Sequence, residues 1–398
     1  MRIAFVAPYQ GPGLVERRPI VRNLSLGSRA KIELIAELLQ KNSHSVEILS
    51  QGEVIEPELR AYPAFREDEA FSSSIPIYYA SAVPVKFVNG FWSSRSTLRL
   101  LKARHRKAPF DLVILYNLKP TQVSCANYAI SKLGLPVILE YEDDQFRESE
   151  PTSRASFITS QFQLRAARKL LASLSGCIAG SPALLAQVPS NVPKLLLPGV
   201  VGAATQRPKA SSENGRNWVV FSGTHSPPQG LEQLVKGWKL ANLSDWQLHI
   251  AGHGEVTASL HRLAQNDPSI VFRGVLGRHE NAQFLSEGKL TIVPYDISTT
   301  QGFSFKTLEC LGAGMHVIST RLSALDGLES DLKAGITFMN DNAPETIAAS
   351  LRSVIEERRY EVTVQQATME RYGPEAVSRS LNTLLQQVMI FSTARNGR

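Results

Sequence analysis

The residues from Gln301 to Thr320 have the types and the order of an anion-binding site. The stretch QGFSFKTLECLGAGMHVIST combines a glycine loop, a short helix that begins near Lys306, a Gly-Ala-Gly stop and a further strand. Backbone N–H groups and the helix dipole favour phosphate at such a helix N-terminus, and the Lys306 ammonium adds a unit of positive charge. We expect Lys306 to bind phosphate. The alternative is an ordinary lysine in a first helical turn, where the positive helix end disfavours it.

Four carboxylates follow one apolar strand in the first half of the chain. The run LPVILEYEDD places Glu140, Glu142, Asp143 and Asp144 at the end of that strand. At this spacing the carboxylates are expected to raise one another's pKa, as a proton acceptor or a hydroxyl-binding group requires. The alternative is a solvated acidic loop.

Positive charge is concentrated in the first half of the chain. The net charge is +7, and residues 1–200 hold 24 Lys and Arg against 17 Asp and Glu, whereas residues 201–398 hold 19 of each sign. Residues 70–110 contain no acid but seven cations: Lys86, Arg95, Arg99, Lys102, Arg104, Arg106 and Lys107. Such a segment attracts anions, and the interleaved Phe87, Phe91 and Trp92 favour lipid headgroups or a lipid-linked acceptor. A solvated helix face is the alternative.

Several classes of protein are disfavoured by what the sequence lacks. The three cysteines are scattered without metal-ligand spacing, which favours a reducing compartment, and no His pair or D-x-D motif indicates a metal ion, so no cofactor is expected. No apolar run approaches the length of a membrane span, and MRIAFVAPYQ is strand-like, unlike an export signal. The expected location is the cytoplasm, with the inner face of the cell membrane as a second site that the basic segment suggests. No nucleic-acid-binding motif occurs, and no G-x-G-x-x-G follows the first strand of either domain, which disfavours a dehydrogenase.

Apolar runs alternate with helical patterns along nearly the whole chain. Strand-like runs occur before residue 200 at 2–7, 45–51, 111–118, 135–142, 176–181 and 194–200, and after residue 216 at 217–223, 246–252, 270–275, 290–295 and 315–320. This rhythm predicts an α/β fold of two Rossmann-like αβα domains with parallel sheets. The predicted parts are a first domain at 1–200, a polar linker at 201–216, a second domain at 217–372 and a C-terminal helix with its tail at 373–398.

Ligands of such sheets bind where the strands end, so the site is expected in the cleft between the domains. In the first domain, Gly11, Pro12 and Gly13 end the first strand, where a ligand can approach a backbone without bulk. A flexible surface loop is the alternative.

The ordered set of motifs resembles glycosyltransferase family 4, the retaining enzymes of the GT-B fold. The stretch at 301–320 is similar to the family's E-G-F-G-x-x-x-x-E signature, FSGTHSPPQGLEQL to its first C-domain loop, LHIAGHGE to its second glycine turn, and VFRGVL to its F-x-G strand end. The resemblance implies an acceptor-binding domain at 1–200 and a nucleotide-sugar-binding domain at 217–372 that face each other across a cleft, with a C-terminal crossover helix and tail at 373–398. It also implies metal-independent transfer of a sugar from a nucleoside diphosphate sugar. The implied acceptor is lipid-linked or of the cell-surface polysaccharide or lipopolysaccharide type.

The resemblance also implies roles for residues. Lys306 would stabilise the leaving diphosphate, Glu309 would accept hydrogen bonds from the donor ribose, and Asp143 or Asp144 would face the donor sugar. Glu142, Gly11, Pro12 and Gly13 would line the acceptor side of the cleft. Donor contacts are expected from Gly223, Thr224, His225, Gln229, Gly252, Arg273, Gln301, Gly302, Phe303, Ser304 and Thr307.

Three positions depart from the family pattern. Gln301 stands where the first glutamate of the pair is usual, and Thr224 and Gln229 stand where an arginine and a lysine hold the diphosphate. Charge-assisted bonds to phosphate are about twice as strong as neutral ones, so Arg273, His225 or a base of the first domain would have to compensate. A catalytically weak GT-B scaffold that binds a nucleotide sugar or a partner protein is therefore the alternative function.

Overall fold

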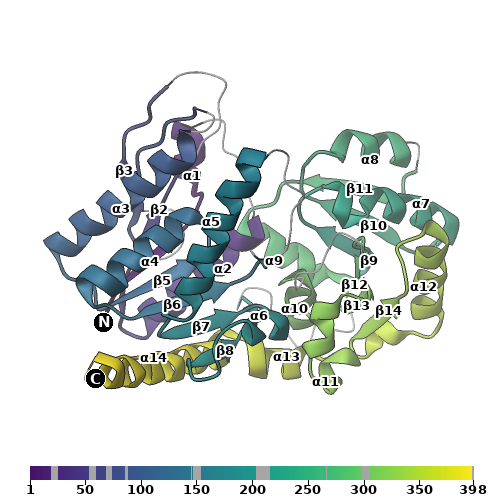
Figure 1. Cartoon of the computed structure of the whole chain (residues 1–398). Coiled ribbons are helices and arrows are strands. Elements are labelled where there is room, and N and C mark those ends of the chain that lie inside the picture. Colours follow the sequence, from purple (N-terminus) through teal and green to yellow (C-terminus); the bar gives the residue numbers. More distant parts are fainter. Residues whose placement is uncertain are drawn as a thin grey trace. The chain divides into compact units, whose positions relative to one another are not determined.

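The structure is a computed structural model of the whole chain, and it describes residues 1–18, 26–52, 60–68, 74–85, 88–144, 146, 154–202, 216–265, 267–297 and 305–396 (Figure 1). The chain forms two compact units, Met1–Leu197 with Ser378–Arg398, and Pro198–Val377. Most of the expected linker, residues 203–215, lies outside the described residues.

The N-terminal unit contains a sheet with the strand order β3-β4-β2-β1-β5-β6-β7-β8. Its strands are β1 (Arg2–Ala7), β2 (Ser45–Ser50), β3 (Phe65–Glu67), β4 (Ile77–Tyr79), β5 (Leu112–Tyr116), β6 (Val137–Tyr141), β7 (Gly176–Ala179) and β8 (Lys194–Leu196). Its helices are α1 (Pro12–Arg17), α2 (Leu26–Lys41), α3 (Asn89–Lys107), α4 (Pro120–Leu133), α5 (Arg154–Leu171) and α6 (Pro182–Ala186). β3 and β4 pair antiparallel, and the other neighbours in the sheet pair parallel.

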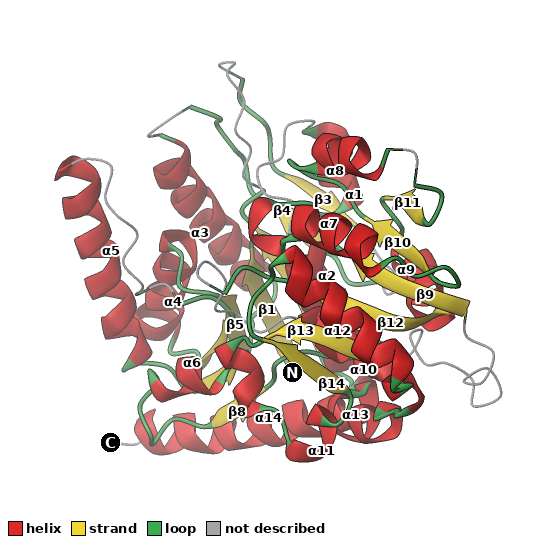
Figure 2. Ribbon diagram, turned by 90° about the vertical axis from the view of Figure 1, so that its right-hand side faces the viewer, coloured by secondary structure: helices red, strands yellow, loops and turns green. Residues whose placement is uncertain are grey.

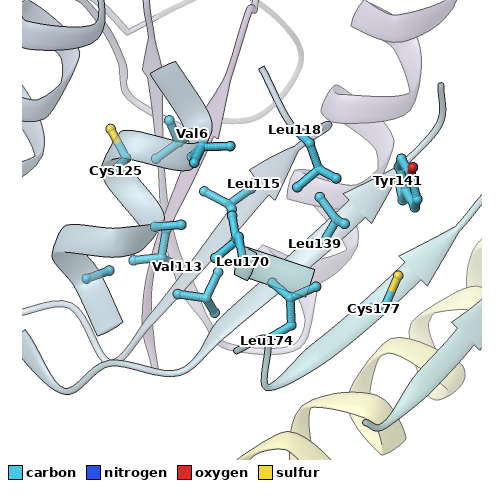
Figure 3. Close-up of a cluster of buried hydrophobic side chains, with 14 of the residues drawn as sticks. Val6, Val113, Leu115, Leu118, Cys125, Leu139, Tyr141, Leu170, Leu174 and Cys177 are labelled. Carbon is cyan, nitrogen blue, oxygen red and sulfur yellow. The ribbon is translucent and has the colours of Figure 1, made fainter. Parts of the chain in front are cut away.

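The central strands are buried and largely apolar because both faces of the sheet are covered. Successive side chains of a strand point to opposite faces, so Val113 and Leu115 of β5 face one layer of helices while Ile114 faces the other way. Figure 3 shows Val113, Leu115, Leu139 and Leu170 meeting in the core that lies between the sheet and helices α3 to α5. Truncating one such leucine to alanine typically costs about 2–5 kcal/mol of stability.

Helix α4 illustrates how local sequence sets the limits of a helix. Pro120 occupies the first turn, where its missing N–H costs nothing, and Gly134 ends the helix in the left-handed conformation with φ 65°. The sequence pattern did not predict the short β3–β4 pair, because strands of three residues are too short to show a period.

The C-terminal unit contains a parallel sheet with the order β11-β10-β9-β12-β13-β14. Its strands are β9 (Arg216–Ser222), β10 (Gln247–Ala251), β11 (Ile270–Gly274), β12 (Gly288–Val293), β13 (His316–Thr320) and β14 (Ile336–Met339). Its helices are α7 (Leu231–Ala241), α8 (Thr257–Ala264), α9 (Arg278–Glu287), α10 (Phe305–Gly312), α11 (Ser330–Lys333), α12 (Pro344–Glu356) and α13 (Gln365–Tyr372), with 3-10 turns η3 (Pro227–Gln229), η4 (Ser323–Gly327) and η5 (Arg359–Glu361).

Two buried clusters cover the two faces of this second sheet, one with α7, α8 and α12 and the other with α9, α10 and α13. Figure 2 shows α7 and α12 side by side over the strands. The strand order reverses between β9 and β12, as in a doubly wound sheet. The predicted α/β class with two Rossmann-like sheets is confirmed.

The last helix, α14 (Pro374–Asn396), packs on the N-terminal unit from Ser378 onward. Ser378 Oγ donates to Asn42 Oδ1 at 2.8 Å, and Arg395 Nη1 donates to the Ser173 carbonyl at 3.2 Å. Val388 approaches Gly176 so closely that any side chain at residue 176 would collide with it. The end of the chain therefore belongs structurally with its beginning.

Candidate active site

The parallel strands of the C-terminal sheet all end at one edge, and glycines follow or close three of them. The Gly223 N–H donates to the Ala251 carbonyl at 3.0 Å, and the Gly252 N–H donates to the Gly274 carbonyl at 2.7 Å. A side chain at Gly252, where φ is 125°, would collide with the Gly223 carbonyl. The turns after β9 and β10 are thus closely packed, and residue 252 has no room for a side chain.

Lys306 lies at the same edge, one residue inside α10. Its Nζ donates to Gln229 Oε1 at 2.7 Å and lies 4.2 Å from the centroid of the Phe221 ring. A side chain at Gly223 would collide with the Lys306 ammonium. A neutral amide, an aromatic face and a bare backbone therefore fix the position of this cation without neutralising its charge.

Glu309 follows Lys306 by one helical turn, so the two side chains lie on the same side of α10. Glu309 is partly exposed, whereas Thr307 is fully buried, and Thr307 Oγ1 has no hydrogen-bond partner among the described residues. The expected donor contacts Gln301, Gly302, Phe303 and Ser304 lie outside the described residues.

His225 ties the loop after β9 to the loop after β10. Its backbone N–H donates to the His253 carbonyl at 3.1 Å, and its Nδ1 lies 2.9 Å from Thr257 Oγ1. Burial is the main reason that the pKa of His225 is lowered, so the ring is neutral at pH 7. His225 therefore shapes the turn and brings no positive charge to it.

Arg273 of β11 contacts side chains of the other strands β10 and β9. Its Nε donates to His249 Nδ1 at 3.0 Å, and its guanidinium lies 5.0 Å from the Trp218 ring centroid. Burial, reinforced by the arginines 273 and 216, lowers the pKa of His249 to about 4. Thr224, one of the departures from the family pattern, is exposed.

In the N-terminal unit, side chains of this chain itself occupy the Gly-Pro-Gly turn. The Gly11 N–H donates to the Tyr79 hydroxyl at 3.0 Å and the Gly13 N–H donates to Glu67 Oε1 at 2.8 Å. The Tyr79 hydroxyl donates to Glu67 Oε2 at 2.8 Å. Glycine at residue 11 is needed because a Cβ there would lie 2.6 Å from the Tyr79 hydroxyl. Pro12 begins α1.

The four carboxylates around β6 diverge to three different partners. Glu140 and Glu142 both pair with the buried Lys31 of α2, with Nζ 3.3 Å from Glu140 Oε1 and in direct contact with Glu142 Oε1. Burial, more than mutual repulsion, raises the pKa of Glu140 to about 8 and also raises the pKa of Glu142. The sequence predicted a raised pKa for these carboxylates, and the pKa is raised for both residues. The main cause is burial instead of repulsion between them.

The aspartates that follow are exposed and bound differently. Asp143 Oδ2 accepts a hydrogen bond from Asn117 Nδ2 at 2.8 Å, and Asp144 Oδ2 accepts one from Gln187 Nε2 at 3.1 Å. Both remain open to solvent at the carboxyl edge of the N-terminal sheet. Sequence reasoning missed Lys31, because a lysine that opens an apolar helical pattern resembles a surface residue.

Part of the chain matches a protein family, and the whole chain is similar in structure to solved proteins. Residues 216–357 match the family model described as glycosyl transferases group 1. The chain is similar in structure to a sucrose-phosphate synthase from Thermosynechococcus elongatus, at 15% identity over 98% of this chain and 99% of that chain, with a TM-score of 0.74. It is also similar to HepE of Anabaena in complex with UDP (15% identity, 97% and 100% covered, TM-score 0.66) and to the lipopolysaccharide outer core galactosyltransferase WaaB (15% identity, 97% and 99% covered, TM-score 0.59). No curated protein matches the chain by sequence.

These findings define the class. The chain has the GT-B fold of two Rossmann-like domains, as the similar solved structures do. Its residues 216–357 form a group 1 glycosyltransferase domain, which supports a glycosyltransferase activity for the protein. The narrower resemblance to family 4 stays a prediction.

Proposed function

We propose that this protein moves a sugar from a nucleoside diphosphate sugar to a glycan or lipid-linked acceptor, with retention of configuration and without a metal ion. The single observation that carries the proposal is the Lys306 ammonium, held by Gln229 and Phe221 at the carboxyl edge of the glycosyltransferase domain. The names of HepE structures include UDP and UDP-glucose, which supports a nucleotide sugar as donor.

Negative charge grows on the diphosphate as the bond to the sugar breaks. A cation that is already in place stabilises this charge more in the transition state than in the ground state, which is the condition for a faster reaction. Lys306 takes this role in the proposal, with the first N–H groups of α10 beside it. Glu309, one turn further along, accepts hydrogen bonds from the donor ribose.

The acceptor is assigned to the N-terminal unit, with Asp143 or Asp144 facing the donor sugar. The similarity to WaaB, named as a lipopolysaccharide outer core galactosyltransferase, supports an acceptor of the lipopolysaccharide or surface-polysaccharide type.

We assign the protein to the cytoplasm and to peripheral contact with an anionic membrane through the basic helix α3. None of the helices in the described part of the chain is long and apolar enough to span a bilayer.

The second candidate is a GT-B scaffold that binds a nucleotide sugar or a partner protein with little or no turnover. The neutral His225 and the position of Arg273 against His249 favour it, because neither replaces the cations that are usual at residues 224 and 229.

One assay separates the two candidates. The protein is incubated with UDP-, GDP-, ADP- and dTDP-sugars, and free nucleoside diphosphate is measured, with slow donor hydrolysis as the signal without acceptor. Release from one donor that persists in EDTA supports the enzyme, and NMR of the released sugar tests retention. Tight nucleotide binding without release from any donor would favour the scaffold.

A further inference from the structure

The helices on one face of the N-terminal sheet contain no acidic residue. Helices α3, α4 and α5 hold no Asp or Glu, whereas α2 contains Glu33 and Glu37. Their cations are Arg95, Arg99, Lys102, Arg104, Arg106, Lys107, Lys132, Arg154, Arg165, Arg168 and Lys169. Helix α4 contacts both α3 and α5, and Figures 1 and 2 both place the three helices in one layer. This layer therefore carries charge of one sign well beyond the basic segment that the sequence indicated.

Helix α3 presents an aromatic side chain and cations on one stripe. Phe91, Arg95, Arg99 and Arg106 are exposed, and their spacing of four, four and seven residues keeps them on one side of the helix. Phe91 is 69% exposed. Arg104 lies outside the stripe and donates two hydrogen bonds to Glu47, at 2.9 and 2.8 Å.

Helix α5 repeats this arrangement. Phe162, Arg165 and Lys169 are exposed and follow one another at three and four residues, so they also share one side of their helix. Phe162 is 66% exposed, and no other phenylalanine besides Phe91 is so exposed among the described side chains. Water makes such exposure of two large aromatic rings unfavourable unless a partner covers them.

We propose that α3 and α5 together form a docking face for an anionic bilayer, with Phe91 and Phe162 entering the headgroup region. Lipid headgroups attract the cations, and the acyl boundary accepts the aromatic rings. Each aromatic ring is followed by cations on its own helix, as in amphipathic segments that bind anionic membranes. This inference names the surface that makes the membrane contact. It rests on the proposed function, which gives the protein a reason to bind a membrane.

A probe at residue 162 tests the insertion directly. The three native cysteines are buried, so a Phe162→Cys variant can be labelled selectively at the surface with the fluorophore NBD. With vesicles of phosphatidylcholine and phosphatidylglycerol, NBD emission should rise and move to shorter wavelength. The matched probe at Lys239→Cys, an exposed residue of α7, should not respond.

Removal of charged side chains tests the electrostatic contribution to vesicle binding. An Arg165→Gln, Lys169→Gln variant should bind the anionic vesicles roughly thirtyfold more weakly, because each cation near such a surface contributes on the order of 1 kcal/mol. Lys236→Gln, Lys239→Gln removes two exposed charges from α7 and should leave vesicle binding unchanged. High salt should weaken wild-type binding, and pure phosphatidylcholine should not retain the protein.

The outcomes separate this inference from the proposed function. Unchanged UDP affinity together with lost vesicle binding in the α5 variant supports the docking face. Equal loss in the α5 and α7 variants, a silent NBD probe on bound vesicles, or binding to RNA or duplex DNA in preference to vesicles would overturn it. Failure of the wild type to bind any nucleotide would instead contradict the proposed function.

Discussion

Lys306 and Gln229 form a pair in which a neutral amide orients a cation. Nζ donates to Oε1 at 2.7 Å, and the amide brings no negative charge beside the ammonium. Gln229 thus replaces the lysine of the family pattern and, in this chain, positions Lys306. We regard Gln229 as a positioning residue.

Replacing Gln229 by Glu should weaken the binding of nucleoside diphosphates. A carboxylate would pair with the ammonium, and the diphosphate would have to displace it, at a cost of about 1.5–3 kcal/mol for a charged hydrogen bond. Calorimetry with UDP, GDP and ADP measures the effect. Gln229→Asn serves as the neutral control, and a Glu variant that binds as tightly as wild type would show that Lys306 does not contact the diphosphate.

Replacing Gly223 by Ala should displace the Lys306 ammonium. The new methyl group would collide with it, and a displacement of about 1 Å in a reacting group can cost roughly a hundredfold in rate. The control is Gly134→Ala, since Gly134 also has positive φ but a Cβ there would meet nothing within 4 Å. Comparable donor hydrolysis by both variants would mean that the collision is irrelevant to turnover.

Replacing Glu309 by Ala should weaken nucleotide binding by about 1–3 kcal/mol, because the ribose hydroxyls would lose a charged acceptor. Calorimetry with UDP and GDP measures the change. Glu356→Ala, at an exposed carboxylate of α12, is the control. Identical affinities for wild type and the Glu309 variant would remove this residue from the site.

Glu140 should make stability depend on pH. Burial raises the pKa of its carboxyl from 4.5 to about 8, against the opposing effect of Lys31. Between these values the folded chain holds a proton that the unfolded chain has lost, so the free energy of unfolding falls as pH rises through this window. Glu140→Gln should flatten that part of the profile.

Urea unfolding at about pH 5 and about pH 9 measures this slope. The Glu140→Gln variant should gain stability relative to wild type at the higher pH, whereas Glu16→Gln, at an exposed carboxylate, should follow the wild type. Parallel profiles for wild type and the Glu140 variant would contradict a protonated, buried Glu140.

The architecture could be predicted from the sequence because buried strands of a parallel sheet have a recognisable local pattern. The run LVILY is apolar on both faces, VILEY is apolar except for Glu140, and turn residues separate both runs from helical patterns. The place of Lys306 at the start of a helix was also predictable, since the glycine loop before it and the helical spacing after it are local features.

Contacts between distant segments could not be predicted in this way. Lys31 reaches the carboxylates 140 and 142 from over a hundred residues away, and Tyr79 and Glu67 occupy the Gly-Pro-Gly turn from short strands with no period. Neither the types of these residues nor their spacing in the sequence indicates which residues they contact. The roles assigned to Lys306, Glu309, Asp143 and Asp144 stay predictions.

The most direct test of the account is the turnover of Lys306→Ala on the donor that wild type uses. Removing one preorganised group that stabilises a developing anion typically costs about 2.7–4 kcal/mol, so the release of nucleoside diphosphate should slow by roughly 10²–10³. The thermal unfolding temperature should stay close to that of wild type, because the side chain is partly exposed. A folded variant that releases nucleotide within about threefold of the wild-type rate would contradict the assignment of Lys306 to the leaving group.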